Sequence, residues 1–433
     1  MSEFINRPLS RRGFLGGATV AAGLGLTACG GGQQKAAEAP SGKEGGGTIT
    51  AGTAYSTQNY DPSTTSSALA LGVNWQVVEG LYGLNFHDYS TFNELATADP
   101  KKVDDYTFEI TLRDGAKFSD GNEVKADDVV ESFNRSAAKG SVYVPMLSPI
   151  ASVEKKDDKT VTVKTTIANF SLLKERLSIV RVVPASSSQD EMKKQPVGSG
   201  PWQFESISDN TLDLVPNKNY NGATPAKDEK LHYDVLKDPT ARLTAQQDGT
   251  TLAMEMVPAD AVDQLKGAGC TVDAVQGFGV RFAMFNLGKA PWDNVKVRQA
   301  CLYALDTDKM LANAFSGQAE VATSYLPSSF ANYHKASTVY AHDVDKAKKL
   351  ISESGITPGD VVLRTTDNEQ VKSMATQVKN DLDALGFNVS IVSDTSPATY
   401  AAIDAVDGSW DILLAPGDPS CFGADVDLLL NWW

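Results

Sequence analysis

VVLRTTDNEQVKSMATQVKNDLDALGFNVSIV, residues 361–392, places one amphipathic segment between two short apolar ones. Residues 361–365 predict a strand, because the run is short and rich in β-branched side chains. The middle segment predicts a helix, since its apolar residues recur every three or four positions: Val371, Met374, Val378, Leu382 and Leu385. Gly386 should end that helix, and residues 387–392 predict a second strand. This order indicates a β-α-β unit of a mostly parallel sheet, and therefore the α/β class.

The sequence around this unit continues the alternation of helix and strand. Asp293 is expected to cap a helix that extends to Leu305, and Asp343 a second helix that stops at Gly355. Residues 410–414 predict a strand, and residues 415–418 a loop directly after it.

The first half of the chain holds a second set of predicted elements. Residues 48–53 predict a strand, and a helix should follow whose inward face carries Leu71, Trp75, Val78 and Tyr82. Residues 106–112 predict a half-buried strand whose inward side chains are Tyr106, Phe108, Ile110 and Leu112. Glycines 115 and 121 supply turns, and the next helix should bury Val129, Val130 and Phe133.

Length and charge limit the possibilities further. A chain of 433 residues is too long for one hydrophobic core, so we expect at least two domains. The formal net charge of −15 argues against nucleic acid, or an anionic membrane surface, as the principal partner.

The N-terminus is typical of a bacterial export signal. Arg11 and Arg12 precede an apolar run, residues 14–26, that is too short to span a membrane. The paired arginines resemble a twin-arginine signal, and Leu-Thr-Ala-Cys, ending at Cys29, resembles a lipobox whose cysteine is acylated. We therefore expect a signal peptide over residues 1–28 and a lipidated flexible tether over 29–47, which anchors the protein to the outer face of the cell membrane.

Chemistry-bearing residues are sparse. Cys270, Cys301 and Cys421 have no short spacing and are interpreted as structural thiols, although one pair could bridge. The four histidines are far apart, and the glycine-rich stretches fit neither a P-loop nor a dinucleotide-binding motif. We expect no enzymatic activity, no metal site and no cofactor.

Several motifs resemble those of the family 5 extracellular solute-binding proteins, the peptide- and nickel-binding group of ABC importers. They are Val-Glu-Gly-Leu-Tyr (78–82), Leu-Arg-Asp-Gly-Ala-Lys-Phe-Ser-Asp-Gly (112–121), Gly-Ser-Gly-Pro-Trp (198–202) and Val-Arg-Gln-Ala (297–300). The resemblance runs from about Thr48 to the last residue.

The resemblance implies a periplasmic-binding-protein-like fold, in which two α/β lobes close over a ligand. We expect the first lobe at residues 48–277, with an inserted subdomain at about 71–195, and the second at 278–433. In such proteins a last segment returns to the first lobe, and that segment is expected to be missing here. The protein is expected to act as a monomer.

The resemblance also implies where a peptide would bind. In peptide-binding relatives a Gly-Asp carries the carboxylate that pairs with the peptide's α-amino group, and Asp418 stands at that point; a solvated turn aspartate is the alternative. Arg364 could hold the other end, although a surface or structural role is equally compatible. Tyr55 and Ser56 follow the opening strand where relatives contact the ligand, while Glu255, on an apparent strand at 252–257, could equally face solvent. Packing against the neighbouring subdomain is the alternative for Tyr55.

The function that follows is capture of short peptides and their delivery to an ABC permease and ATPase. The alternatives are another solute, such as a nickel chelate or an oligosaccharide, or use of the fold for pheromone sensing, chaperoning or adhesion at the cell surface.

Overall fold

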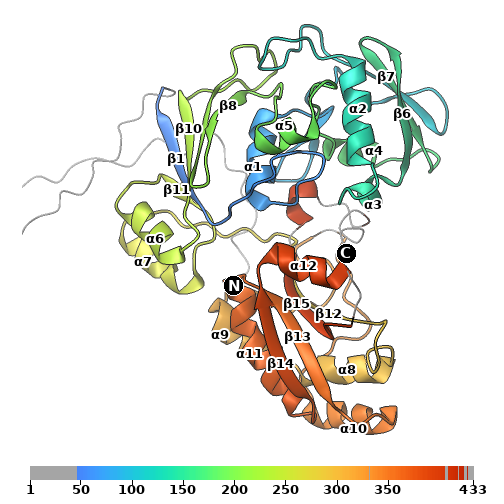
Figure 1. Cartoon of the computed structure of the whole chain (residues 1–433), viewed down its shortest axis with the longest axis vertical. Coiled ribbons are helices and arrows are strands. Elements are labelled where there is room, and N and C mark those ends of the chain that lie inside the picture. The colour runs from blue at the N-terminus through green and yellow to red at the C-terminus, as the bar shows by residue number, and fades with distance from the viewer. Residues whose placement is uncertain (1–45, 331, 405–407, 418, 424–426, 428–433) are drawn as a thin grey trace, which may run out of the picture. The chain divides into compact units, whose positions relative to one another are not determined.

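The computed structural model describes residues 46–330, 332–404, 408–417, 419–423 and 427. Within these residues the chain forms a mixed α/β structure with three larger sheets and one small hairpin (Figure 1). This confirms the α/β class predicted from the sequence. The boundaries of the lobes and of the inserted subdomain stay predictions.

The first sheet has five strands in the order β11-β1-β10-β9-β8. They are β1 Thr48–Thr53, β8 Trp202–Ile207, β9 Thr211–Pro216, β10 Lys230–Val235 and β11 Ala253–Met254. The predicted strand 48–53 is confirmed as β1, which pairs in parallel with both β10 and β11. Three parallel strands therefore end at the same edge of this sheet. The strand expected at 252–257 is only the two residues of β11, so Glu255 lies just beyond it.

Helices α1 Ala68–Val77, α5 Gln189–Lys194, α6 Pro239–Gln247 and α7 Val262–Gly267, and a 3-10 turn at Ala259–Ala261, lie in this part of the chain. The inward face predicted for the first helix was wrong. Helix α1 ends at Val77, and its buried residues are Leu69, Ala70, Val73, Asn74 and Val77. A β-carbon on Gly198 would lie 2.1 Å from the carbonyl oxygen of Val77, so only glycine permits this close packing against the end of the helix.

Another sheet, called the third sheet below, has four strands in the order β4-β5-β7-β6 and lies inside the segment predicted as a subdomain. Its strands are β4 Lys101–Lys102, β5 Thr107–Thr111, β6 Ile150–Asp157 and β7 Thr160–Thr165. The hairpin of β2 Tyr82–Leu84 and β3 Thr91–Asn93 and the helices α2 Ala126–Ser136, α3 Val144–Leu147 and α4 Leu173–Ser178 accompany it.

The alternation predicted for the strand at 106–112 holds over most of its length. Phe108, Ile110 and Leu112 are buried, but Tyr106 precedes β5 and is 51% exposed, so its predicted inward position was wrong. Gly115 and Gly121 have φ of 69° and 92°, as their turns require.

The second sheet has the order β12-β15-β13-β14 and carries the β-α-β unit. Its strands are β12 Val280–Phe285, β13 Asp360–Thr366, β14 Asn388–Asp394 and β15 Ile412–Gly417. Helices α8 Val295–Ala304, α9 Thr307–Phe315, α10 Val344–Ser354, α11 Glu369–Asp383 and α12 Ser396–Asp404, and a 3-10 turn at Pro419–Phe422, complete it. Strands β13 and β14 pair in parallel, which confirms the predicted unit.

Two details of this region differ from the prediction. Helix α8 is capped by Asn294, whose side chain accepts a hydrogen bond from the Lys296 amide at 3.0 Å, and not by Asp293. The strand expected at 410–414 lies two to three residues further on, at Ile412–Gly417. The Asp411 carboxylate before it accepts hydrogen bonds from the Trp292 indole and the Val362 amide. Asp343 caps α10 as predicted, with an oxygen 2.9 Å from the Lys346 amide.

Candidate functional site

The carboxyl ends of three parallel strands meet at one edge of the second sheet. Strands β13, β14 and β15 all run toward this edge, and β12, antiparallel to β15, starts there with Val280 opposite Gly417. Open α/β sheets bind ligands at such an edge, because the loops that leave the strands carry polar groups without strand partners.

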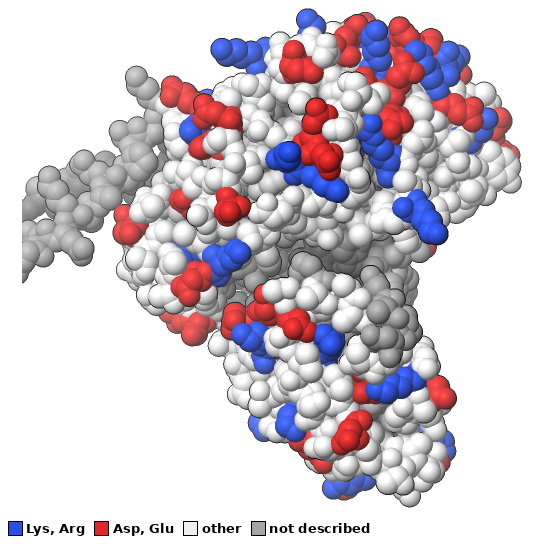
Figure 2. All heavy atoms as spheres, in the orientation of Figure 1, with Lys and Arg blue, Asp and Glu red and all other residues white. Residues whose placement is uncertain are grey.

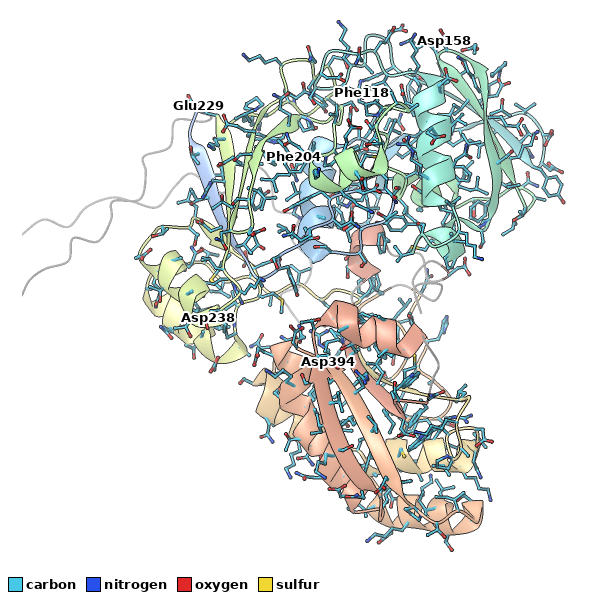
Figure 3. All side chains as sticks on the ribbon, in the orientation of Figure 1. Phe118, Asp158, Phe204, Glu229, Asp238 and Asp394 are labelled. Atoms are coloured by element: carbon cyan, nitrogen blue, oxygen red, sulfur yellow. The ribbon has the colours of Figure 1, made fainter. Side chains whose placement is uncertain are left out.

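Arg364 lies near the end of β13, and the structure pairs it with Asp394. Figure 3 labels Asp394 at the end of β14. The Nη1 atom of Arg364 is 2.6 Å from Oδ2 of Asp394, so one edge of the guanidinium is already used. The Nε atom of Arg364 and the hydroxyl of Thr366 are both buried, and neither has a hydrogen-bond partner among the residues that the structure describes. Buried polar groups of this kind are uncommon in native proteins and are frequently satisfied by a ligand or a water molecule.

Two further side chains reach the same edge from other elements. Arg281 of β12 donates a hydrogen bond to Gln370 in the first turn of α11. Tyr400 of α12 donates to the Pro416 carbonyl of β15 at 3.5 Å, and burial raises the pKa of this phenol. Arg281, Gln370 and Tyr400 were not singled out from the sequence, because only the strand pairing brings them together.

Asp418, the predicted partner of a peptide amino group, lies outside the described residues. Its neighbour Gly417 is the last residue of β15.

The edge of the first sheet brings two of the other predicted residues close together. An oxygen of the Glu255 carboxylate accepts a hydrogen bond from the Ala54 amide at 3.0 Å, which joins the end of β11 to the residue before Tyr55. Tyr55 is half-buried and packs against the core of this sheet, whereas Ser56 and Glu255 are exposed.

Arg242 of α6 holds this edge together, and no sequence motif pointed to it. Its Nη1 atom donates to the Leu236 and Lys237 carbonyls at 2.6 and 2.9 Å, and its Nη2 atom donates to the Met256 carbonyl at 3.3 Å. Burial lowers the pKa of Arg242, and the nearby Glu255 carboxylate opposes that shift. We interpret Arg242 as a structural clip between the loops that follow β10 and β11.

A small cavity in the first half of the chain was also missed. It is lined by Pro62, Leu71, Asn74, Trp75, Tyr143, Ile179, Arg181 and Phe422. Trp75 and Leu71 belong to the apolar face that the helical pattern predicted; in the structure both line this cavity, and Leu71 also packs against the core. A pattern of apolar residues cannot separate a core face from a pocket wall, because both bury the same side chains.

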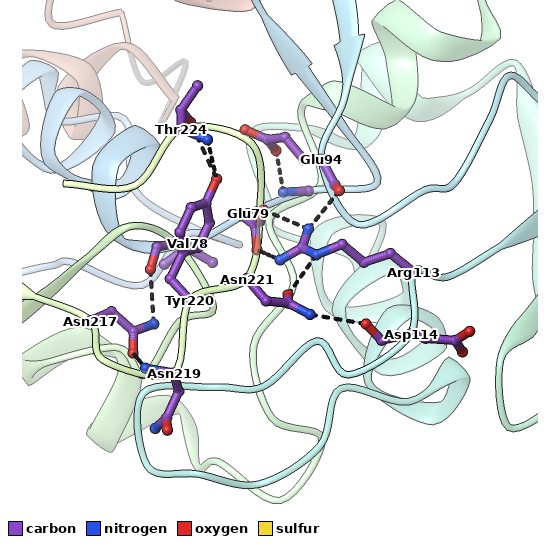
Figure 4. Close-up of polar contacts among 12 residues, drawn as sticks. Val78, Glu79, Glu94, Arg113, Asp114, Asn217, Asn219, Tyr220, Asn221 and Thr224 are labelled. Carbon is purple, nitrogen blue, oxygen red and sulfur yellow. Dashed lines mark hydrogen bonds and ion pairs between the residues drawn. The ribbon is translucent and has the colours of Figure 1, made fainter.

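The cavity residue Arg181 belongs to a network of two carboxylates and two guanidinium groups, of which Figure 4 shows Arg113, Glu79 and Glu94. Arg113 holds Glu79 through two hydrogen bonds of 2.8 Å, and Arg181 binds Glu94 at 2.7 Å. Burial raises the pKa of Glu94, while the Arg181 charge lowers it. The guanidinium of Arg181 also stacks 3.2 Å from the centroid of the Trp75 ring.

The residues of the predicted export signal and anchor, Arg11, Arg12 and Cys29, lie outside the described residues. Among the residues that the structure describes, no helix is long and apolar enough to cross a membrane.

Basic and acidic side chains are interspersed over the face shown in Figure 2.

Comparison with known proteins gives a consistent result. Residues 92–432 match the family "Bacterial extracellular solute-binding proteins, family 5 Middle". Heme-binding protein A of Haemophilus influenzae is 31% identical over 74% of this chain, and a putative ABC transporter peptide-binding protein of Brucella ovis is 30% identical over 58%. The chain spans 64% and 49% of the lengths of these two relatives.

Solved structures share the fold. The periplasmic binding protein DppA from Helicobacter pylori, in complex with the peptide STSA, has a TM-score of 0.81 at 21% identity, covering 90% of this chain and 81% of that one. The oligopeptide-binding protein AppA from Bacillus subtilis, in complex with a nonapeptide, has a TM-score of 0.76 at 21% identity, covering 87% and 80%. These likenesses confirm the predicted periplasmic-binding-protein-like fold.

Proposed function

The chain belongs to family 5 of the bacterial extracellular solute-binding proteins, and we propose that it captures short peptides outside the cell and passes them to the permease of an ABC importer. In this role it binds its ligand without catalysing a reaction. One observation carries the proposal. The edge of the second sheet that leads into Asp418 carries Arg364 and Thr366, each with a buried polar atom that has no partner in the described residues.

A peptide supplies groups that suit this edge. Its α-ammonium would pair with the Asp418 carboxylate, and its backbone amides and carbonyls would satisfy the unpartnered groups at the ends of the strands. Capture would then depend on the difference in ligand contacts between an open and a closed state.

Arg364 fits a limited role at the other end of the peptide. Its charge is matched by Asp394 at 2.6 Å, so a ligand carboxylate would meet a guanidinium whose positive charge is already paired. We therefore propose that the peptide's C-terminus is not clamped here, which would allow peptides of different lengths.

Asp418→Asn tests the proposal directly. Removing the carboxylate leaves the peptide's ammonium poorly compensated, at a cost of ~2 to 5 kcal/mol, or about thirty-fold or more in affinity. N-acetylated peptides, which carry no charge at that end, should bind the native protein weakly and lose little more on mutation. Calorimetry with matched free and acetylated peptides measures both losses.

Asp345→Asn is the matched control, because Asp345 is an exposed aspartate in the first turn of α10, outside the loops of this edge, and should leave peptide affinity unchanged. Equal losses for free and acetylated peptides would show that Asp418 does not hold the amino terminus. The same titration with hemin and with nickel–histidine measures whether this protein binds either of two solutes that related proteins bind.

The proposed anchor can be tested independently. Cys29→Ser should move the protein from the membrane fraction to the soluble fraction without changing its thermal unfolding, because the glycine-rich segment that follows separates the anchor from the fold. Ala28→Ser, which keeps the cysteine, is the control. Retention of the Cys29→Ser protein on membranes after a carbonate wash would contradict a lipid anchor.

A further inference from the structure

Two residues that line the cavity beside α1 each carry a buried polar atom that nothing in the described protein satisfies. These atoms are the Nη2 atom of Arg181 and the Oδ1 atom of Asn74. Arg181 is 6% exposed and Asn74 is 2% exposed, so neither atom has bulk water as an alternative partner. An unsatisfied buried donor or acceptor costs roughly 1 to 3 kcal/mol, which makes two of them in one cavity a sign of a missing group.

The orientation of the Asn74 amide follows from its other contact. Its Nδ2 atom donates to the Tyr60 carbonyl at 2.9 Å. Turning the amide over would place two oxygens against each other, so Oδ1 must be the atom that remains without a partner. The cavity therefore offers one donor, from Arg181, and one acceptor, from Asn74.

The charge around the cavity is already balanced. Arg181 is paired with Glu94 at 2.7 Å, and Arg113 with Glu79 at 2.8 Å. A ligand carboxylate would feel Arg181 and Glu94 at once, and would lose its hydration for little net attraction. An ammonium group would face the Arg181 guanidinium. The balanced network favours a neutral group.

Size and wall chemistry narrow the choice further. The cavity has about 20 Å³ of space for a water-sized group, and the rings of Trp75, Tyr143 and Phe422 line it. A hydroxyl, or one end of a carboxamide, fits this space, and each can both accept from Arg181 and donate to Asn74.

We propose that this cavity is a specificity subsite for a neutral hydroxyl- or carboxamide-bearing side chain of the bound peptide, such as serine or asparagine. The inference rests on the proposed peptide-binding function. Phe422, four residues after Asp418, lines the cavity and so connects the subsite to the segment that follows β15.

The test uses tetra-alanine and its singly substituted variants, with Ser, Asn, Asp or Lys at each position in turn, titrated calorimetrically into the native protein. At one position Ser or Asn should bind about tenfold more tightly than Ala, and Asp and Lys should bind no more tightly than Ala. Equal affinity of Ser, Asn and Ala at every position would overturn the subsite, and would indicate a cavity that holds only water.

Variants locate the effect. Arg181→Lys keeps the charge beside Glu94 but removes Nη2, and Asn74→Leu removes Oδ1; in each variant the affinities of the Ser, Asn and Ala peptides should fall within about twofold of one another. Arg113→Lys is the matched control, since this guanidinium belongs to the same network but does not line the cavity, and it should retain the preference.

The two levels of the proposal fail differently. If no peptide of the series binds, the proposed function is wrong, and the inference is wrong with it. If the peptides bind but Arg181→Lys and Asn74→Leu keep the preference, only the assignment to this cavity is wrong. The peptide series on the native protein decides the question even if one variant fails to fold.

Discussion

At the scale of single residues, much of the polar chemistry of this protein serves to hold it together. Asp411 joins a tryptophan and a strand, and Arg242 joins two loops. Such roles could not be predicted from the sequence, because their partners are mostly backbone carbonyls and amides, which every residue carries. Which of these backbone groups a side chain reaches depends on how the fold brings distant chain segments together.

His232 is the residue whose ionisation should affect stability most directly. Its Nδ1 atom lies 2.7 Å from Asp213 and its Nε2 atom 3.2 Å from Asp234, and the hydrogen bond to Asp213 is the main reason that its pKa is raised. A raised pKa means that the folded state binds the proton more tightly. The stabilisation should therefore be complete below the ordinary histidine pKa of about 6.5 and be lost as pH rises through the raised value.

Urea unfolding of the native protein and of His232→Gln, at pH 6 and at pH 9, measures this contribution. The native protein should lose more stability than the variant between the two pH values. His87→Gln, at an exposed position between β2 and β3, should behave like the native protein. An identical pH dependence in all three proteins would show that His232 makes no contribution.

At the scale of secondary-structure elements, the sequence predicted most where one local signal had no competitor. Asp343 caps α10, and the β-α-β unit at 360–394 was found because its two periodicities differ. The prediction failed where two local candidates competed. Asp293 and Asn294 are both good caps, and the choice depends on where the preceding turn leaves the chain, which is a tertiary effect.

Helix α8 allows the two candidate caps to be compared. Asn294→Ala should reduce the free energy of unfolding by about 1 kcal/mol, because the Lys296 amide loses its partner. Asp293→Ala, at the exposed neighbouring position, should change it by less than about 0.5 kcal/mol. Chemical denaturation of the two variants side by side gives both values. A larger loss for Asp293→Ala would reverse the assignment.

The candidate site shows the same division. The sequence and the family resemblance indicated a ligand site after β15, because an apolar run followed by Gly-Asp can be recognised from the sequence alone. The cavity of Arg181 and Asn74 was not predicted, because it depends on Phe422 meeting residues more than 200 positions earlier.

At the scale of the whole molecule, the position of β1 affects how the protein folds. Thr48 pairs with Lys230, and Ala51 with Ala253, so the first strand of the chain meets its partners 182 and 202 residues later. The third sheet is much more local, since Thr107 pairs with Lys164 only 57 residues away. Closing a longer loop costs more entropy, and high contact order slows folding.

Refolding should therefore be sequential, with amides of β5 and β7 protected before those of β1. Pulsed hydrogen exchange read by mass spectrometry follows both regions in one experiment, and simultaneous protection would contradict this order. During synthesis the consequence is sharper still. Strand β1 leaves the ribosome long before its partners and stays without them until about 200 further residues have followed, so in a newborn chain this segment is exposed to chaperones and to aggregation for that time.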